Sequence, residues 1–273
     1  MGGSNPTCLP GRTAVVGQHR RSVRGEESTI DALGLTGERT LPGITIENYW
    51  YRRHEAAYLA LLPHCRDAVV LEAGCGEGYG AAAIARVASR VLALDYDAAT
   101  VAHVAATYPQ VGVVRGNLVA LPLAAGSVDV VASLQVVEHL WDQARFVREC
   151  ARVLRPGGTL LLTTPNRLTF SPGRDTPLNP FHTRELTAAE LAGLLRDNGF
   201  AVRALLGLRP GPQLSSLDSR HGGSMAAAQL AVPPERWSPE LSADVATVTA
   251  ADFLLSATDV AASLDLVAIA VPA

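Results

Sequence analysis

The sequence contains no lysine, and its 23 basic side chains are all arginines. Lysine is the side chain that forms Schiff bases with carbonyl substrates or, with a lowered pKa, acts as an amine base. Mechanisms that need a lysine amine are therefore excluded. The formal net charge of −3 gives no electrostatic reason to expect a nucleic-acid partner, because proteins that bind nucleic acid usually carry a basic surface.

Cysteines are also few. The four of them, Cys8, Cys65, Cys75 and Cys150, include no C-x-x-C pair, so their spacing indicates neither a disulfide framework nor a zinc site. No apolar run approaches the ~18 residues of a membrane span, and the first residues lack the apolar segment of a signal peptide. These absences predict a cytoplasmic protein without a membrane span.

The first part of the chain differs in composition from the rest. Residues 1–31 are rich in Gly, Pro, Ser and Arg without an apolar period, which predicts a disordered tail. Residues 32–273 are expected to form one domain, because 48% of the chain is hydrophobic and can bury a substantial core. A helix is expected over residues 47–62, with the basic cluster 52–54 on its solvated face.

A glycine-rich segment, Val69-Val-Leu-Glu-Ala-Gly-Cys-Gly-Glu-Gly-Tyr-Gly80, is the centre of the predicted domain. Its composition predicts a strand over residues 68–71, a tight loop and a helix over residues 79–88. Glycine permits positive φ and lets backbone N–H groups approach a ligand closely. A dinucleotide-binding G-x-G-x-x-G loop would need glycine where Tyr79 stands. The spacing therefore argues against a nicotinamide cofactor.

Glu72-Ala-Gly74-Cys-Gly76-Glu-Gly78 resembles instead the first motif of class I S-adenosylmethionine-dependent methyltransferases. The resemblance implies that Glu72, Gly74, Gly76 and Gly78 bind the cofactor around its methionine part. The alternative for this segment is a loop that only packs a strand against a helix.

Strands and helices continue to alternate. A second strand, over residues 90–94, ends at Asp95, about 20 residues after the glycines, where nucleoside-binding α/β folds place a carboxylate that accepts hydrogen bonds from ribose. Asp95 is the predicted ribose ligand, with Tyr96 beside it, and Asp97 is predicted to cap the next helix. A third strand is expected over residues 111–114.

The segment after the third strand, Arg115-Gly-Asn-Leu-Val-Ala-Leu-Pro122, resembles the adenine-contacting segment of the same family. The resemblance implies that the side-chain oxygen of Asn117 accepts a hydrogen bond from the exocyclic amine of adenine. Leu118 would offer its backbone N–H.

A fourth strand, over residues 127–133, leads into Leu134-Gln-Val-Val-Glu-His-Leu-Trp141. Gln135, Glu138 and His139 are therefore expected near the carboxyl ends of parallel strands, where open α/β sheets bind ligands. A helix over residues 146–154, a turn at Arg155-Pro-Gly-Gly158 and a fifth strand over residues 159–164 come next. The ordered series from Leu71 to Thr164 is similar to the type 11 methyltransferases.

The last hundred residues predict two more strands, over residues 200–206 and 264–271, and two irregular regions between the elements. Residues 165–186 form a long polar loop, which is usually functional in a compact domain. Thr187 and Glu190 make a capping box for a helix to Asn198.

The second irregular region, residues 209–263, is too long for a hairpin and is predicted to be a helical insertion that covers the acceptor, with helices near 225–230 and 239–255. The expected fold is a seven-stranded, doubly wound, Rossmann-like α/β methyltransferase sheet whose last strand is antiparallel.

Two histidines are candidates for the catalytic base, because an imidazole titrates near neutral pH. His182, in Asn179-Pro-Phe-His-Thr-Arg184, follows strand five and is the first choice, with a purely structural role in its loop as the alternative. His139 is the second. The pair Glu138-His139 also occurs in quinone-ring O-methyltransferases that use a divalent ion, but Gln135 replaces the first carboxylate of their pattern. A divalent metal is therefore possible but not predicted.

Several short segments resemble actinobacterial methyltransferases associated with methylglucose lipopolysaccharide, a cytoplasmic polymethylated glucan. These segments are Thr36-Gly-Glu-Arg, Asn48-Tyr-Trp, Phe170-Ser-Pro-Gly-Arg-Asp-Thr-Pro, Asn179-Pro-Phe-His-Thr-Arg-Glu-Leu, Arg220-His-Gly-Gly-Ser and Ser263-Leu-Asp-Leu. The resemblance implies O-methylation of a glucose hydroxyl, with the 6-position as one expected site, on an oligosaccharide or glycolipid acceptor. The alternatives are methylation of a quinone or small phenol, and a non-catalytic module that binds S-adenosylmethionine. The sequence predicts no oligomeric state.

Overall fold

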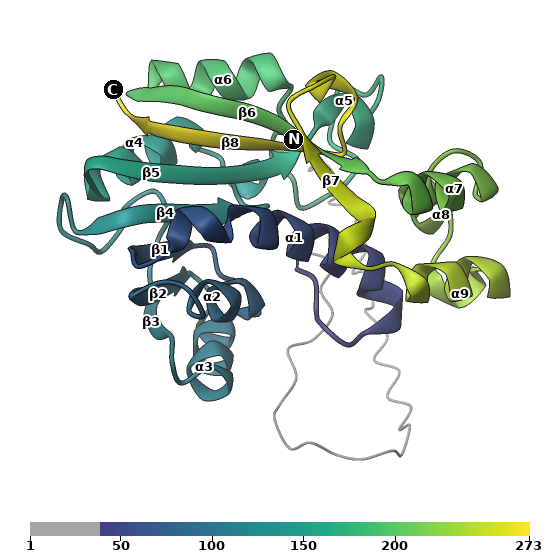
Figure 1. Cartoon of the computed structure of the whole chain (residues 1–273), viewed down its shortest axis with the longest axis horizontal. Coiled ribbons are helices and arrows are strands. Elements are labelled where there is room, and N and C mark those ends of the chain that lie inside the picture. The colour runs from purple at the N-terminus through teal and green to yellow at the C-terminus, as the bar shows by residue number, and fades with distance from the viewer. Residues whose placement is uncertain (1–38) are drawn as a thin grey trace, which may run out of the picture. The chain divides into compact units, whose positions relative to one another are not determined.

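The structure is a computed structural model that describes residues 39–273. The expected disordered tail, residues 1–31, and Cys8 within it lie outside the described residues. In the described part, the strands are β1 (Val69–Ala73), β2 (Arg90–Asp95), β3 (Gly112–Arg115), β4 (Val128–Leu134), β5 (Leu154–Pro165), β6 (Phe200–Pro210), β7 (Phe253–Ser256) and β8 (Asp265–Pro272). They form one sheet in the order β3-β2-β1-β4-β5-β8-β6-β7 (Figure 1).

The expected Rossmann-like α/β arrangement is present, but the predicted number of strands was wrong. Strands β1 to β5 are parallel to one another, and β8 is antiparallel to both β5 and β6. The sheet of the described chain has eight strands, not seven, because β7 pairs with the end of β6 from Gly207 to Pro210. Periodicity alone does not distinguish a four-residue apolar run such as Phe253–Ser256 from part of a helix.

The helices also correct several predicted boundaries. They are α1 (Asn48–Leu61), α2 (Tyr79–Ile84), α3 (Ala98–Thr107), α4 (Gln143–Val153), α5 (Arg167–Phe170), α6 (Ala188–Asp197), α7 (Pro212–Arg220), α8 (Met225–Ala231) and α9 (Pro239–Thr247). The helix expected over 79–88 ends at Ile84, and the one expected over 239–255 ends at Thr247. Residues 155–158, expected as a turn, belong to β5. The helices α5, within the expected loop 165–186, and α7 were not expected.

Two hydrophobic cores lie on opposite faces of the sheet. Side chains alternate between the faces along each strand, so Val70 packs with residues of α1, α2 and α3, whereas Leu71 packs with residues of α4 and α6. In Figure 1, α1 crosses one face of the sheet, and the labels of α4 and α6 lie beside β5 and β6. Burial on both faces is typical of a parallel sheet and leaves the strand ends for ligands.

Polar side chains fix the starts of two helices, as predicted. The Asp97 carboxylate accepts a hydrogen bond from the backbone N–H of Ala99 at the start of α3. Thr187 and Glu190 form the expected capping box of α6. Each cap satisfies an N–H group that the first helical turn leaves without an intrahelical partner.

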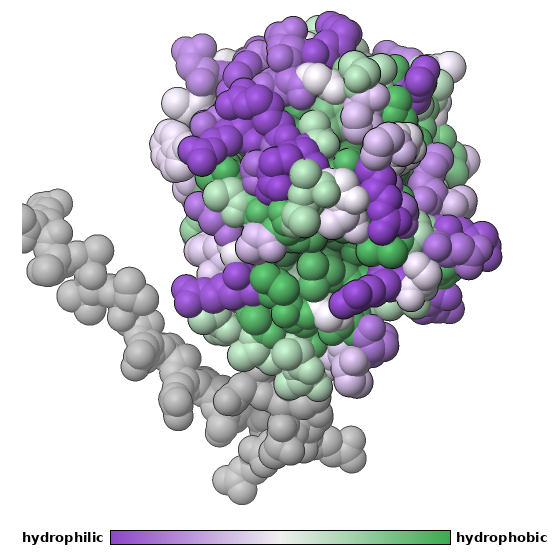
Figure 2. Space-filling view, turned by 90° about the vertical axis from the view of Figure 1, so that its left-hand side faces the viewer, coloured by the Kyte–Doolittle hydropathy of each residue, from purple (hydrophilic) through white to green (hydrophobic). Residues whose placement is uncertain are grey.

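The surface is mixed in polarity. Figure 2 shows one face of the molecule, on which apolar residues gather in the middle and polar residues surround them. Among residues 39–273, no helix is both long enough and apolar enough to cross a membrane.

Candidate active site

A cavity of about 620 Å³ opens at the carboxyl ends of the parallel strands. Its wall includes the residues that directly follow β1, β2 and β4, which are Gly74, Tyr96 and Gln135, together with Asp95 at the end of β2. This is the edge at which open α/β sheets bind ligands. The cavity brings together most of the predicted site residues: Gly74, Gly76, Asp95, Tyr96, Leu118, Gln135, His139 and His182.

Three predicted residues are not on the cavity wall. Glu72 is buried beneath the glycine loop, where its Oε1 accepts a hydrogen bond of 2.6 Å from the Tyr58 hydroxyl. Gly78 is the N-cap residue of α2, and a side chain there would overlap Val104. Asn117 uses its side-chain oxygen locally, accepting the backbone N–H of Val119 at 3.0 Å.

The glycine loop is held against β2 by its own backbone. The N–H of Gly74 donates to the carbonyl of Leu94 at 2.8 Å, and the N–H of Gly76 donates to the Asp95 carboxylate at 3.0 Å. Gly76 has a φ of 51°, and a Cβ built there meets nothing within 4 Å. The loop at Gly76 is therefore open enough for a ligand to approach the backbone.

Asp95 holds the loop and is still able to bind a ligand. One carboxylate oxygen accepts from Gly76, and the other accepts from the backbone N–H of Asp97 at 3.0 Å. A carboxylate has about four lone-pair directions, so these two bonds leave acceptor capacity for hydroxyl groups. Tyr96, which follows Asp95, is 63% exposed and also lines the cavity.

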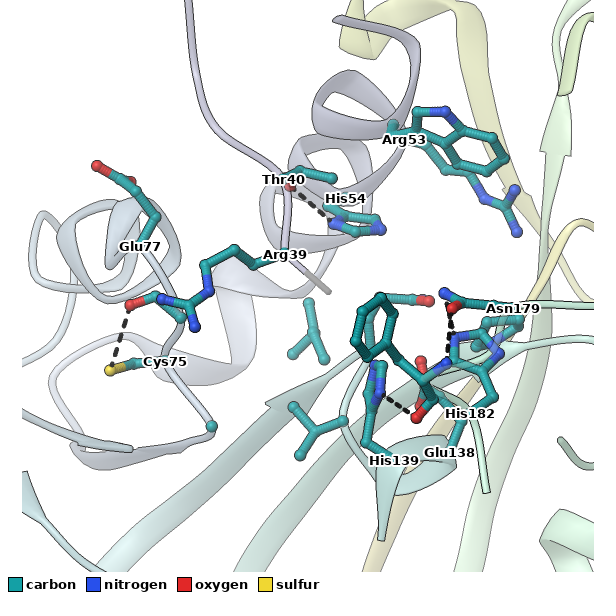
Figure 3. Close-up of a pocket in the computed structure, with 18 of the residues that line it drawn as sticks. Arg39, Thr40, Arg53, His54, Cys75, Glu77, Glu138, His139, Asn179 and His182 are labelled. Carbon is teal, nitrogen blue, oxygen red and sulfur yellow. Dashed lines mark hydrogen bonds between the residues drawn. The ribbon is translucent and has the colours of Figure 1, made fainter. Parts of the chain in front are cut away.

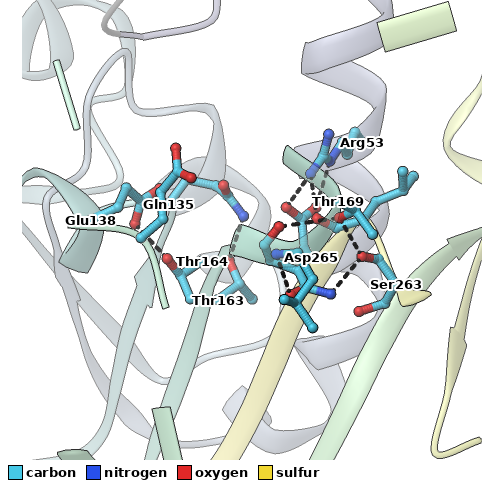
Figure 4. Close-up of polar contacts among 12 residues, drawn as sticks. Arg53, Gln135, Glu138, Thr163, Thr164, Thr169, Ser263 and Asp265 are labelled. Carbon is cyan, nitrogen blue, oxygen red and sulfur yellow. Dashed lines mark hydrogen bonds and ion pairs between the residues drawn. The ribbon is translucent and has the colours of Figure 1, made fainter. Parts of the chain in front are cut away.

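Gln135 follows β4 in a left-handed conformation, with a φ of 58°. Its backbone N–H donates to the carbonyl of Thr163 at 3.0 Å, and its side-chain amide donates to the hydroxyl of the same residue at 3.1 Å (Figure 4). Non-glycine residues in this conformation are uncommon and cluster at functional sites. The bend turns the chain from β4 toward Glu138 and His139.

The two candidate histidines lie together on the opposite wall of the cavity (Figure 3). Their ring centroids are 4.9 Å apart. His139 lies in the 3-10 turn η3 (Val137–His139), and its Nδ1 is 3.0 Å from the carbonyl oxygen of Phe181. Because a carbonyl can only accept, Nδ1 carries the hydrogen. Burial, together with a smaller effect of the nearby His182, lowers the pKa of His139 to about 4.

His182 has a polar partner at each ring nitrogen. Its Nδ1 lies 2.7 Å from Oε1 of Glu185, and its Nε2 lies 3.2 Å from the amide nitrogen of Asn179. The loop that carries His182 is bound to η3, because the backbone N–H of Thr183 donates to the carbonyl of Glu138 at 2.7 Å. Residues from separate parts of the chain are thereby held in one wall.

The cavity wall contains a cluster that could in principle bind a metal ion. It consists of Glu138, His139 and His182, whose ligand atoms lie within 4.8 Å of one another. The Glu138 carboxyl accepts a hydrogen bond of 3.1 Å from the Thr164 hydroxyl, and burial raises its pKa to about 8. A metal would need the Nε2 lone pair of His182, which faces an amide N–H of Asn179 instead. As arranged, the three residues do not offer a complete set of free lone pairs, so the fit to a metal is poor.

The helix α1 contributes residues that sequence reasoning missed. The cluster 52–54 was expected on a solvated face, but Arg53 is only 3% exposed and makes a 2.6 Å hydrogen bond to Asp265 (Figure 4). His54 lines the cavity, and burial lowers its pKa to about 4. The helical period places both residues on the same side of α1 as the buried Ala57. This spacing indicated burial, but the run of charged residues suggested a solvated face instead.

Aromatic and apolar side chains close the cavity on the side of the histidines. Trp50 and Phe170 lie edge to face with ring centroids 6.2 Å apart, and Phe181 and Leu230 complete this wall. Phe170 and Phe181 come from the loop 165–186, and Leu230 comes from α8 in the region 209–263. Both irregular regions therefore reach the cavity.

Comparison with known proteins identifies the family. A model of the methyltransferase domain matches residues 71–162. A "probable S-adenosylmethionine-dependent methyltransferase" of Mycobacterium tuberculosis is 61% identical over 245 residues, which cover 88% of this chain and 89% of the relative. The chain belongs to the S-adenosylmethionine-dependent methyltransferases. It is an enzyme whose methyl donor is S-adenosylmethionine.

A second relative agrees with this assignment, and a solved structure agrees with the fold. A relative from Mycolicibacterium smegmatis with the same description is 62% identical, and the match covers 88% of this chain and 95% of that protein. Among solved structures, a chain of the complex between the Haloferax volcanii Trm112 methyltransferase activator and a methyltransferase superposes with a TM-score of 0.57 at 17% identity. That match covers 84% of this chain and 93% of the other, and it supports the fold alone.

Proposed function

We propose that this methyltransferase transfers the methyl group to a sugar hydroxyl, namely a glucose hydroxyl of an α-glucan, with the 6-hydroxyl as the first candidate. The observation that supports the proposal most directly is that the two walls of the cavity differ in chemical character. One wall holds the strand-end groups Gly76, Asp95 and Gln135, and the other holds two imidazoles among aromatic rings. A cofactor on the first wall would present its methyl group to an acceptor on the second.

The strand-end wall supports the assignment of cofactor ligands. Asp95 has acceptor capacity left for the ribose hydroxyls. Gly76, where a Cβ would meet nothing within 4 Å, leaves room for the methionine part. Gly74 and Leu118, the proposed adenine contact, also line the cavity. Glu72, Gly78 and Asn117 are assigned a supporting part, because their contacts hold the loop, the helix start and the β3 turn rather than face the cavity.

The opposite wall supports a sugar as the acceptor. Loop 165–186 and region 209–263 are the proposed acceptor-binding loop and cover, since Phe170, Phe181 and Leu230 reach the cavity from them. Apolar rings beside polar imidazole nitrogens suit a ligand with apolar faces and hydroxyl edges, as ligand sites combine apolar walls with a few placed polar groups. The segments that carry Phe170 and Phe181 are also those that resemble the methylglucose-associated enzymes.

Methyl transfer from a sulfonium is an in-line displacement on a donor that is already activated. Alignment of the acceptor oxygen with the methyl carbon can contribute ~7–11 kcal/mol to lowering the barrier. A sugar hydroxyl is a weak acid, so a base contributes a further ~10²–10⁴-fold. His182 is the proposed base and His139 its neighbour in the same wall.

The acceptor is tested directly with radiolabelled S-adenosylmethionine and a panel of glucosides, mannosides and phenols. Label on an oligoglucoside supports the proposal, and label on phenols alone would favour the quinone or small-phenol alternative. Replacement of His182 by alanine should lower turnover without changing the affinity for the cofactor. His64→Ala is the matched control, because His64 is an exposed histidine away from the cavity.

The ribose assignment has its own test. Calorimetric titration of the cofactor into Asp95→Ala protein should show weaker binding than titration into the wild type. Unchanged affinity would remove Asp95 from the cofactor site while leaving the acceptor assay to decide the rest.

A further inference from the structure

We propose that Glu185 is the positioning residue that makes His182, rather than His139, the group that takes the proton of the acceptor hydroxyl. This inference rests on the proposed methylation of a hydroxyl. It assigns a role to a buried carboxylate that lies between the proposed base and the start of α6.

The hydrogen bonds of Asn179 fix where the hydrogen sits on His182. The side-chain oxygen of Asn179 accepts the backbone N–H of Phe181 at 3.0 Å, so its amide nitrogen is the atom that faces Nε2 of His182. An amide nitrogen only donates. Nε2 must therefore be the unprotonated nitrogen of a neutral ring, and Nδ1 must carry the hydrogen.

Glu185 is the acceptor of that hydrogen. Its Oε1 lies 2.7 Å from Nδ1 of His182, and the side chain of Glu185 is 1% exposed. Its other oxygen, Oε2, is buried and has no hydrogen-bond partner among residues 39–273. A buried carboxylate with so few partners gains most when the imidazole beside it becomes positively charged, because Coulomb attraction is stronger away from water.

Asn179 marks the position that the acceptor would occupy. Its amide N–H points at the Nε2 lone pair over 3.2 Å, which is long for a hydrogen bond between nitrogen and a strong acceptor. A sugar O–H is a donor of the same kind. The acceptor hydroxyl would take the place of the amide at Nε2, and catalytic hydrogen bonds commonly become short only in such a complex.

His139 lacks an equivalent of Glu185. Its Nδ1 hydrogen is donated to a neutral backbone carbonyl, that of Phe181, which stabilises an imidazolium less than a carboxylate does. Burial also keeps the pKa of His139 near 4, so this ring remains neutral at pH 7. Of the two imidazoles in the wall, only His182 is paired with a carboxylate.

The resulting step is balanced. The acceptor oxygen forms a bond to the methyl carbon, and the bond between carbon and sulfur breaks with its electron pair left on sulfur as a neutral thioether. The hydroxyl proton passes to Nε2 of His182, and the Glu185 carboxylate stabilises the imidazolium. Release of the proton to water restores the neutral ring.

The experiment compares Glu185→Gln with wild type and with Glu235→Gln, a change at an exposed glutamate that does not line the cavity. Glutamine keeps a hydrogen-bond acceptor for Nδ1 but removes the charge. We expect turnover to fall by ~10²–10⁴-fold with the cofactor affinity unchanged. We also expect the acid limb of the pH profile of kcat/KM to move to lower pH, because the imidazolium loses its partner. A merely structural role would not move that limb, so full turnover with an unshifted profile would overturn the proposal.

Nitrogen-15 NMR of the free protein supplies a readout that needs no acceptor. Wild type should show His182 protonated on Nδ1, and the double variant Asn179→Ala/Glu185→Leu, which removes the polar partner of each ring nitrogen, should lose that preference. A hydrogen on Nε2 in the wild type would refute the positioning role even if methyl transfer to glucosides is confirmed. The opposite result is also informative. If His182 carries its hydrogen on Nδ1 but the protein methylates no hydroxyl, the arrangement of Glu185 and His182 is confirmed and the proposed function is overturned.

Discussion

The stability of the protein should depend on pH through Glu72, and Glu72→Gln isolates that dependence. Burial raises the pKa of Glu72 to about 8, because the charged form would lie out of water with only the Tyr58 hydroxyl and the Ala81 backbone N–H to stabilise it. The other carboxyl oxygen is without a partner in the described chain. The folded protein therefore holds a proton on Glu72 at pH 7, which the unfolded chain, with a pKa of ~4.3, releases.

The direction of the effect is set by this difference in bound protons. A carboxyl whose pKa is raised on folding stabilises the protein least at high pH, so stability falls as pH rises from ~4.3 to 8, by about 1.4 kcal/mol per pH unit. Burial raises the pKa of Glu138 to about 8 as well. His54 and His139, whose pKa values are lowered to about 4, act in the opposite direction below pH ~6.5. Wild-type stability should consequently change little between pH ~5 and ~6.5 and fall above it.

Comparison with Glu72→Gln isolates the contribution of Glu72, because the other titrating groups contribute equally to the stability of both proteins. Glutamine keeps an acceptor for the Tyr58 hydroxyl but leaves its own N–H groups without a partner, which costs about 1–3 kcal/mol at every pH. The predicted effect is a difference in slope. Relative to the variant, wild type should lose about 3 kcal/mol of unfolding free energy between pH ~5 and pH ~7. Urea unfolding of cofactor-free protein at several pH values measures this, with Glu235→Gln as the control. Parallel curves for wild type and Glu72→Gln would refute the reasoning.

Three further outcomes are expected. Arg53→Met should destabilise the fold by about 3–5 kcal/mol in urea unfolding, since it leaves Asp265 charged and buried without its partner. A loss below ~1 kcal/mol would mean that the pair is not buried in solution. Gly80→Ala should cost about 1–3 kcal/mol, because its methyl group would overlap the Tyr58 ring, and Tyr58→Ala should recover part of that loss. Chelation of divalent metals should leave methyl transfer unchanged, because in the proposed mechanism the Nε2 lone pair of His182 accepts the proton of the acceptor and so cannot hold a metal. Lost activity that Mg²⁺ or Mn²⁺ restores would contradict this.

Much of the fold could be predicted because burial imposes a pattern on the sequence. The apolar runs of β1, β2 and β4 are buried on both faces, and they alternate with helices that caps such as Asp97 define. Where the pattern failed, the element was short. The four residues of β7 are too few to show a period, and their pairing with β6 depends on residues more than forty positions earlier.

The residues of the strand-end wall could be predicted from their spacing, whereas on the other wall the two histidines were predicted but their contacts were not. The glycines and Asp95 occupy fixed places relative to strand ends, so spacing located them. The contacts of His182 could not be located in this way, because they depend on how loop 165–186 folds back on η3 through the bond from Thr183 to the carbonyl of Glu138. One feature of the sequence did point to the contact between His182 and Glu185. Glu185 follows His182 by three residues, but in an irregular loop that spacing carries no geometric meaning until the backbone is known.

The proposed role of His182 as a base depends on the same loop geometry and requires no metal. A base needs one nitrogen with a free or weakly held lone pair and a second whose hydrogen is accepted by a negative charge. Asn179 and Glu185 supply these two conditions from either side of His182 in the described structure. If the two residues act together, Asn179→Ala and Glu185→Gln should have unlike effects. The first should change mainly the KM of the acceptor, because it alters only the group that the hydroxyl replaces, and the second should change mainly kcat. Equal losses in both parameters for both variants would show that the loop as a whole, and not the polarity of its two partners, determines the activity.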